Sequence, residues 1–466
     1  MGLVAIGACG LRAAPTDLAG QPSKPWSISA SLRGFYDDNI NDLGKDASPG
    51  TNYSRSSIGF EVNPAATLNL VMEQTIINLS AVYSLKYYEN KPMGNADNYD
   101  QTFTFNGSLD HAFSERYRVS VSDSFVIGQE PDMLRQDTLN TFHRISGDNI
   151  RNYGAINFDA VITPLLSLQL GYANTFYDYA YKGSVEFSEW AFFNGHLVYT
   201  PVAVYNPNSG IFEASSAGTM NGIQHTIHLD SRWTIQPETI GIIGVQYTEV
   251  DFTGNEPIGA VLNPSGNPYI PGGPLPTAFI YSDSRNNRGY YGYVGVDHTF
   301  NPRLSGSIRV GARYTDFYND VSTSQNGFSP YAMLSAQYMY APESSVQAGL
   351  TYDRSSTDLV GASSSSTSID YTTDADTVSA YISWNHRITP RLYASLLAQF
   401  QDSMYNGGTY GSLSEQYYLL GLNFEYRFNH YLSANAGYNY DLLDSPPLLN
   451  RGFERNKVYM GITARY

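Results

Sequence analysis

Apolar residues occupy every second position through much of this chain. In Trp26–Arg33 the even-numbered residues are apolar and most odd-numbered ones are serine, and the alternation returns at 58–72, 77–87, 418–428 and 458–466. A period of two is typical of a β-strand with one apolar and one polar face. Three of these segments reach 11–15 residues, whereas strands of soluble sandwiches average about 5–6. Since about 9–11 tilted residues cross a hydrocarbon layer, the pattern predicts membrane-crossing strands.

Short turns alternate with long polar connections along the whole chain. Seven turns share one pattern, with an alternating segment on each side of a few residues rich in Pro, Asn or Thr: DHAFSERYRVSV, DAVITPLLSLQL, RWTIQPETIGII, DHTFNPRLSGSI, QYMYAPESSVQA, NHRITPRLYASL and YRFNHYLSANAG. Met72–Thr75 forms an eighth turn. Nine longer polar segments separate these hairpins: 38–53, 89–97, 130–149, 180–220, 254–286, 318–327, 356–373, 404–414 and 445–455.

Eight turns and nine loops predict 18 strands, with 16 as the alternative. Outer-membrane barrels have short periplasmic turns and longer outer loops, and the same asymmetry here places both termini on the periplasmic side. The predicted fold class is all-β, a transmembrane antiparallel up-and-down β-barrel over residues 26–466.

Composition supports a barrel rather than a helical membrane protein. Charged residues make up 15% of the chain and the mean hydropathy is −0.30, while soluble domains carry about 25% charged residues. No run of about 18 apolar residues occurs, so no spanning helix is expected. The 39 tyrosines and 41 glycines favour strands and turns.

Charge and cysteine content narrow the partners and the compartment. The net charge of −16 argues against nucleic acid as a partner. The single Cys9 excludes an internal disulfide and a multi-cysteine metal site. Residues 1–14 resemble a truncated signal peptide, with a lipoprotein box around Cys9 as the alternative, and 15–25 would be a periplasmic segment. The sequence thus predicts export to the outer membrane.

The C-terminal segment is predicted to be the last strand and to close the barrel. It must pair with Trp26–Tyr36, because an open sheet edge would leave unpaired backbone groups in lipid. Its form also resembles the assembly signal of outer-membrane proteins, which implies the barrel assembly machinery as a partner. The residues that carry closure and signal are Gly461, Ile462, Ala464 and Tyr466.

Three motifs carry a resemblance to a known family. They are the stretch Gly34-Phe35-Tyr36-Asp37-Asp38-Asn39-Ile40 and the pattern H-x-[IF]-x-P-R-L at His298–Leu304 and His386–Leu392. The chain from about Trp26 to Tyr466 resembles the putative beta-barrel porin 2 family. This resemblance implies an outer-membrane barrel, and some members are associated with exopolysaccharide secretion. The family has no established catalytic residues.

Charged residues on the polar face are candidates for lining the lumen. They are Arg33, Asp37, Lys86, Asp110, Arg309, Arg313, Glu425 and Asp441. Such residues either set ion or sugar selectivity or only keep the wall hydrated. Tyr177, Tyr291 and Tyr293 would serve either sugar stacking or packing. The acidic group at 37–42 is interpreted as solvated loop charge, with Ca²⁺ ligation as the alternative.

Three functions remain open from the sequence. The first is a porin-like channel for passive diffusion of small hydrophilic solutes, and the second is the outer-membrane conduit of an exopolysaccharide export system. The third is a structural or adhesive protein with an occluded barrel. The long loops 180–220 and 254–286 would either fold into the lumen as a constriction, dock another protein or form an outer cap. No catalysis, cofactor or metal is expected, and a homo-oligomer in outer-membrane lipid is compatible with all three.

Overall fold

The computed structural model describes most of the chain, as follows: 24–44, 54–90, 97–129, 148–180, 186–193, 196–202, 205–206, 211–212, 216–261, 278–319, 326–359, 362–365, 368–408, 410–449 and 451–466. The predicted leader 1–14 with Cys9, and all but the last two residues of segment 15–25, lie outside the described residues.

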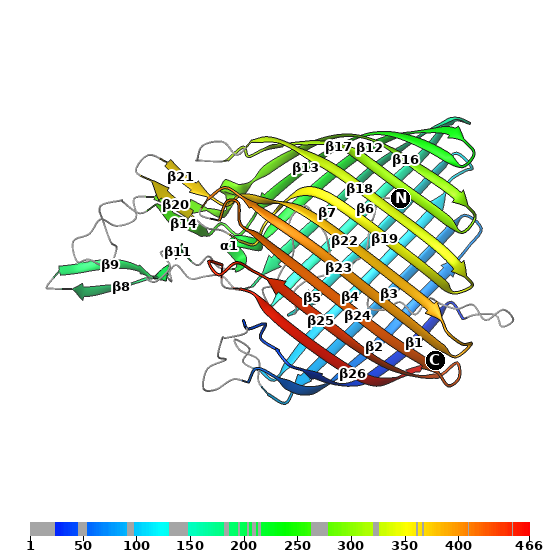
Figure 1. Ribbon diagram of the computed structural model, residues 1–466, viewed down its shortest axis with the longest axis horizontal. Helices are drawn as coiled ribbons and strands as arrows, with labels where there is room; N and C mark the ends of the chain where they lie inside the picture. The colour runs from blue at the N-terminus through cyan, green and yellow to red at the C-terminus, as the bar shows by residue number, and fades with distance from the viewer. Residues whose placement is uncertain are drawn as a thin grey trace.

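Eighteen antiparallel strands form one closed barrel (Figure 1). Each strand pairs with the next one along the barrel, and β26 returns to pair with β1. The predicted barrel of 18 strands is confirmed. The strands are β1 (Trp26–Asp37), β2 (Ser57–Val71), β3 (Thr75–Tyr88), β4 (Tyr99–Ala112), β5 (Tyr117–Gly128), β6 (Asn149–Thr163), β7 (Leu166–Tyr179), β12 (Gly222–Gln236), β13 (Thr239–Phe252), β16 (Asn287–Asn301), β17 (Leu304–Asp316), β18 (Gly327–Ala341), β19 (Ser344–Ser356), β22 (Asp374–Arg387), β23 (Leu392–Asn406), β24 (Ser414–Arg427), β25 (Leu432–Asp444) and β26 (Phe453–Arg465).

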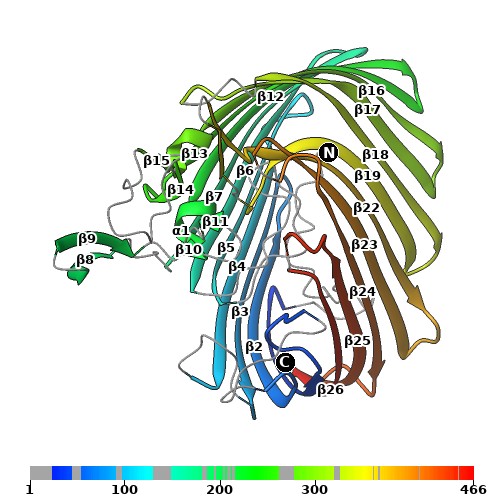
Figure 2. The same ribbon diagram turned by 60° about the vertical axis from the view of Figure 1, so that its left-hand side comes forward.

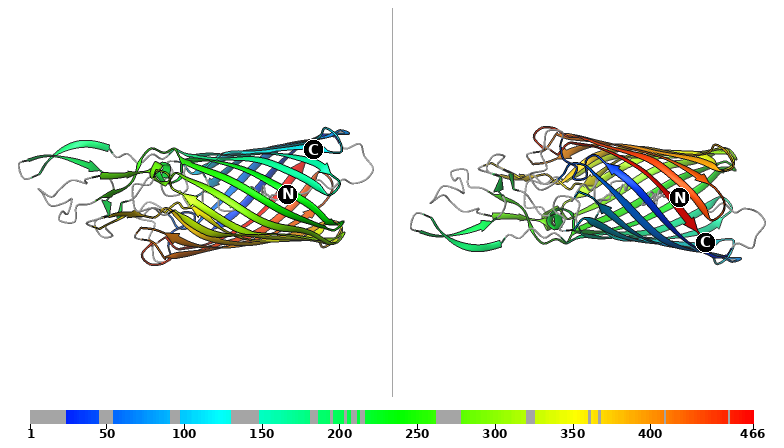
Figure 3. Two further views of the ribbon diagram at one scale, coloured as in Figure 1. Left: turned by 90° about the horizontal axis from the view of Figure 1, so that it is seen from above. Right: turned by 90° about the horizontal axis from the view of Figure 1, so that it is seen from below.

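The long connections gather at one end of the barrel, and the short turns at the other (Figure 3). A hairpin of β8 and β9 extends away from the barrel at the loop end (Figure 1). Within the described residues, no helix is long and apolar enough to cross a membrane. The elements of the connections are β8 (Glu186–Phe193), β9 (His196–Val202), β10 (Tyr205–Asn206), β11 (Ile211–Phe212), α1 (Ser216–Met220), β14 (Pro257–Val261), β15 (Ala278–Tyr281), η1 (Ser282–Arg285), β20 (Ala362–Ser365) and β21 (Ser368–Tyr371).

The two faces of each strand reverse the arrangement found in soluble proteins. On β1, Ile28 and Leu32 point outward and are 55% and 51% exposed, while Ser31 between them is 8% exposed. An apolar outer surface is stable only against lipid, where it meets acyl chains instead of water. The alternation read from the sequence therefore assigns apolar residues to the lipid and polar residues to the interior.

The barrel closes between its first and last strands. Ile462 lies opposite Leu32, and the backbone of Tyr466 exchanges hydrogen bonds of 2.8 and 3.0 Å with Ile28. Gly461 lies opposite Arg33, and a Cβ at this glycine would stand 2.5 Å from Cγ of that arginine. The pairing leaves no open edge along this seam, while the use of this strand as an assembly signal stays a prediction.

Candidate functional site: the barrel interior and its outer mouth

One side of the interior carries a cluster of three cations around one carboxylate. Glu61 on β2 lies opposite Arg33 on β1 and opposite Lys86 on β3. Lys457 on β26 also lies close enough to Glu61 to act on its charge. Aromatic rings flank two of the cations, since the Arg33 guanidinium lies 5.3 Å from the ring of Tyr459 and the Lys457 ammonium 4.9 Å from that of Phe35. This wall is locally cationic within a chain whose net charge is −16.

The facing side of the barrel, from β12 to β19, carries tyrosines bonded to acids. The Tyr293 hydroxyl donates to Asp230 Oδ1 at 2.5 Å, and the Tyr291 hydroxyl donates to Asp353 Oδ2 at 3.1 Å. Arg313 contributes a cation 3.5 Å from Asp353. These tyrosines are buried in the wall. Their hydroxyls are already engaged, which favours packing over sugar stacking.

All eight predicted lumen residues have inward parity on their strands, and most have a polar partner. Asp110 pairs with Arg118 at 2.9 Å, and Glu425 with Arg427 at 3.1 Å. Arg309 lies 3.7 Å from Asp297, and Asp441 accepts a hydrogen bond of 3.2 Å from the Tyr417 hydroxyl. Their influence on permeating solutes stays a prediction.

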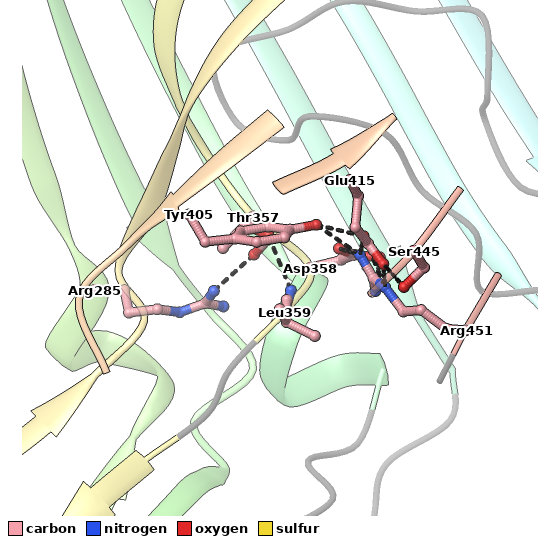
Figure 4. A network of polar contacts seen from close by, with 8 residues as sticks. All are labelled: Arg285, Thr357, Asp358, Leu359, Tyr405, Glu415, Ser445 and Arg451. Atoms are coloured by element: carbon pink, nitrogen blue, oxygen red, sulfur yellow. Dashed lines mark hydrogen bonds and ion pairs between the residues drawn. The ribbon is translucent and has the colours of Figure 1, made fainter. Parts of the chain in front are cut away.

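A network of buried charges lies at the outer mouth, centred on Arg451 (Figure 4). Its guanidinium donates to both Asp358 oxygens at 3.1 Å and to Glu415 Oε2 at 2.5 Å. Tyr405 and Ser445 donate to the same Glu415 carboxylate, each at 2.5 Å. The side chains of Asp358 and Glu415 are fully buried. Burial opposes ionisation of Arg451, yet Asp358, Tyr405 and Glu415 together raise its pKa above the ordinary value, so the cation persists.

Arg285 extends this network toward the other side of the mouth. It is fully buried, and it donates to the carbonyl oxygens of Thr357 at 2.8 Å and Thr219 at 2.5 Å. Its guanidinium also stacks 4.0 Å from the ring of Phe252. Burial lowers the pKa of Arg285 to about 10, which still leaves it charged at neutral pH. A permanent cation bonded to two loop carbonyls fixes those loops in place.

Together these contacts form what we call the outer bridge: Thr219, Arg285, Thr357, Asp358, Glu415 and Arg451. Its ends lie in the connections after β7 and after β25. Around the barrel these two connections are ten strands apart in one direction and eight strands apart in the other. The hydrogen bond from Arg285 to Thr357 joins the β13–β16 connection to the β19–β22 connection, although the β17–β18 connection lies between these two around the barrel. The contacts therefore cut across the mouth instead of following its rim.

The helix α1 adds an apolar contact on the inner side of the mouth. Its Met220 is fully buried against the inward-facing Tyr153, Tyr177 and Phe252 of three different strands. The described end of the 180–220 loop thus packs against inward-facing residues at the loop end of three strands, and the role of the rest of the loop stays a prediction. The side chains of the apolar stretch at 188–212 lie outside the described residues.

Two residues of the acidic group at 37–42, Asp37 and Asp42, form ion pairs with Arg455. Asp37 is fully buried and accepts from Arg455 at 2.6 Å, and Asp42 lies 3.4 Å from the same guanidinium. Solvated loop charge is therefore wrong for Asp37, because the arginine brought by β26 covers it. Among the described residues, no group of three or more His, Cys, Asp or Glu side chains could hold a metal ion.

Sequence reasoning missed Arg285, Arg451 and Arg455. All three lie in or beside long polar segments, where a lone arginine carries no periodic signal. Their carboxylate and carbonyl partners are distant along the chain, so spacing alone cannot reveal the pairs.

Several solved structures align with most of the chain at low sequence identity. The outer membrane protein OpdK from Pseudomonas aeruginosa is 9% identical, with 95% of this chain and 99% of OpdK covered and a TM-score of 0.41. OccAB4 from Acinetobacter baumannii is 9% identical, with 96% and 99% covered and a TM-score of 0.40. The ferric enterobactin receptor PfeA from Pseudomonas aeruginosa is 11% identical, with 94% and 80% covered and a TM-score of 0.40. Structural similarity this low supports no conclusion about function.

No curated protein matched the chain. A family model did match, over residues 279–466, which include both H-x-[IF]-x-P-R-L hairpins but not the Gly34–Ile40 stretch. The resemblance seen in the sequence is thereby confirmed over residues 279–466, which match the putative beta-barrel porin 2 family, and the chain is an outer-membrane β-barrel.

Proposed function

We propose that this protein is a porin-like channel through which small hydrophilic solutes diffuse passively across the outer membrane. The observation that carries the proposal is the polar inner wall of a closed 18-stranded barrel. Barrels of 16–18 strands are too wide for side chains to fill and leave an aqueous path. Passive transport needs no covalent step.

The outer bridge gives this channel its narrow part. The buried ion pairs of Arg451 and the arginine–carbonyl hydrogen bonds of Arg285 together hold loops from opposite sides of the mouth, so a solute must pass beside them. Beneath the bridge, the cationic cluster around Glu61 faces the tyrosine and aspartate wall. A pore with fixed charges of both signs on opposed walls favours polar solutes over apolar ones.

The test is single-channel conductance of the refolded protein in a planar bilayer, first in KCl and then with neutral sugars of increasing size. Steady ohmic steps that larger sugars reduce would support a diffusion pore, and the reversal potential would rank its ion preference. A correctly folded barrel without conductance would overturn the proposal and leave a gated export conduit or a structural anchor.

A further inference from the structure

One carboxylate lies on the lipid-facing side at mid-strand. Asp123 shares its parity on β5 with the exposed Val121 and Ile127, while the buried Val126 points inward. Across the 18 described barrel strands, Asp123 is the only acidic or basic side chain that faces outward in the middle third of a strand. Glu249 and Arg288, which also face outward, lie near the strand ends at the loop side, and the outward-facing Asp402 lies in the loop-side third of β23.

The surroundings of Asp123 differ from the rest of the apolar belt. Its neighbours across the ladder are Gly107 on β4 and Gly154 on β6, so neither adjacent strand places a side chain directly opposite the carboxylate. Asn152 Nδ2 donates to Asp123 Oδ1 at 2.9 Å. Asn174 on β7 lies opposite Gly154 and also faces outward, and its Nδ2 donates to the Gln224 carbonyl oxygen at 3.3 Å and lies 3.4 Å from His225 Nδ1. We call Gly107, Asp123, Asn152, Gly154 and Asn174 the β4–β7 notch, which lies on four strands that run side by side in Figure 2.

Lipid cannot satisfy these polar groups. Acyl chains offer neither donors nor acceptors, and a polar group left exposed in the hydrocarbon is destabilising. An ionised carboxylate has about four acceptor positions, and Asn152 supplies one donor. Phospholipid headgroups lie at the membrane surface, above or below a residue midway along a strand. A partner for the notch must therefore be protein that enters the apolar layer.

We propose that the β4–β7 notch is the contact surface between two copies of this chain in the outer membrane. A twofold contact brings the same patch together with itself, so the patch must carry both donors and acceptors. Asp123 supplies acceptors, and Asn152 Nδ2 has a second N–H besides the one it donates to Asp123, so each copy offers the other a donor and an acceptor. Glycines on both sides of the carboxylate let two barrel walls approach closely, as small residues do between membrane helices.

Crosslinking in native outer membranes tests the contact. A photoreactive amino acid in place of Phe125, which lies opposite Asn152, should yield a species of twice the chain's mass after irradiation. The same substitution at the outward-facing Phe400, on the far wall, should not. Failure to obtain the double-mass species at position 125 in folded protein would overturn the proposal, as would a product joined to a different protein.

Two variants then test which groups hold the copies together. D123L removes the acceptors, and G154L places a bulky side chain beside the carboxylate. Each should reduce the double-mass product by about tenfold or more, equivalent to ~1.4 kcal/mol. The matched control is G292L, because Gly292 also faces lipid and has open space around its Cα. Each variant should keep heat-modifiable migration, since a leucine facing lipid does not disturb the barrel. A double-mass product reduced less than twofold in both variants would contradict the proposal.

Discussion

The two ends of the barrel use charge in different ways. At the loop end, Arg451 joins two carboxylates whose side chains are fully buried, and Arg455 covers a fully buried Asp37. At the turn end, Arg118 and Asp110 form a pair whose side chains are 54% and 32% exposed. These pairs have similar distances, but the carboxylates paired with Arg451 and Arg455 at the loop end are shielded from water and the Arg118–Asp110 pair at the turn end is not.

Burial decides what each pair contributes. An exposed pair gains little because water and salt screen it, whereas breaking a buried pair leaves a charge that neither water nor a partner compensates. The loop end needs such pairs because its segments have no ladder hydrogen bonds to hold them across the mouth. The turn end does not, since its connections are short and the strands themselves fix them.

The largest expected effect follows from Arg451→Ala. Asp358 and Glu415 would then lie buried without their cation, and removing one partner of a buried pair costs about 3–5 kcal/mol. We expect the 357–359 segment to leave the mouth, which would make it accessible to protease and raise single-channel conductance. Limited proteolysis and bilayer recordings of the refolded variant measure both effects.

Arg451→Lys refines this experiment, because lysine keeps the charge but lacks the planar fork that contacts two carboxylates at once. The protease resistance and the single-channel conductance of Arg451→Lys should both lie between those of the wild type and those of the alanine variant. Unchanged conductance and protease resistance in the alanine variant would show that the outer bridge does not hold the mouth.

A smaller effect is expected from Asp37→Asn at the seam of β1 and β26. The amide keeps the shape and one acceptor, and Arg455 retains Asp42 at 3.4 Å, so the loss of stability should be about 1–3 kcal/mol. Urea unfolding in detergent, followed by the gel shift between folded and unfolded forms, measures it. If Asp37→Asn lowered the free energy of unfolding by about 3–5 kcal/mol, the loss expected for Arg451→Ala, the seam would depend on buried charge as much as the mouth does.

The sequence predicts the barrel well because the barrel is periodic. Alternation assigns each residue of β1 to lipid or interior, and the Pro- and Asn-rich turns divide the strands, so both strand number and facing follow from local pattern. Pairing of β26 with β1 follows from the same reasoning, since a barrel in lipid cannot leave an edge open. These features need no knowledge of distant contacts.

The outer bridge could not be predicted for the opposite reason. Arg451 and Asp358 are 93 residues apart, and no repeat or spacing connects them. The same holds for Asp123, whose alternation marks it as lipid-facing, but whose flanking glycines come from two other strands. Cross-strand register supplies that information, and register depends on the whole barrel.

The smallest expected effect is that of Arg118→Ala at the turn end, and it completes the comparison. Because the guanidinium is 54% exposed, its loss should change the free energy of unfolding by no more than about 0.5 kcal/mol. Raising the salt concentration should shrink even that difference, since screening acts on exposed charges. Urea unfolding at low and high salt, in the same detergent as for Asp37→Asn, gives the measurement. A loss equal to that of Asp37→Asn, unaffected by salt, would mean that burial is not what separates the two ends.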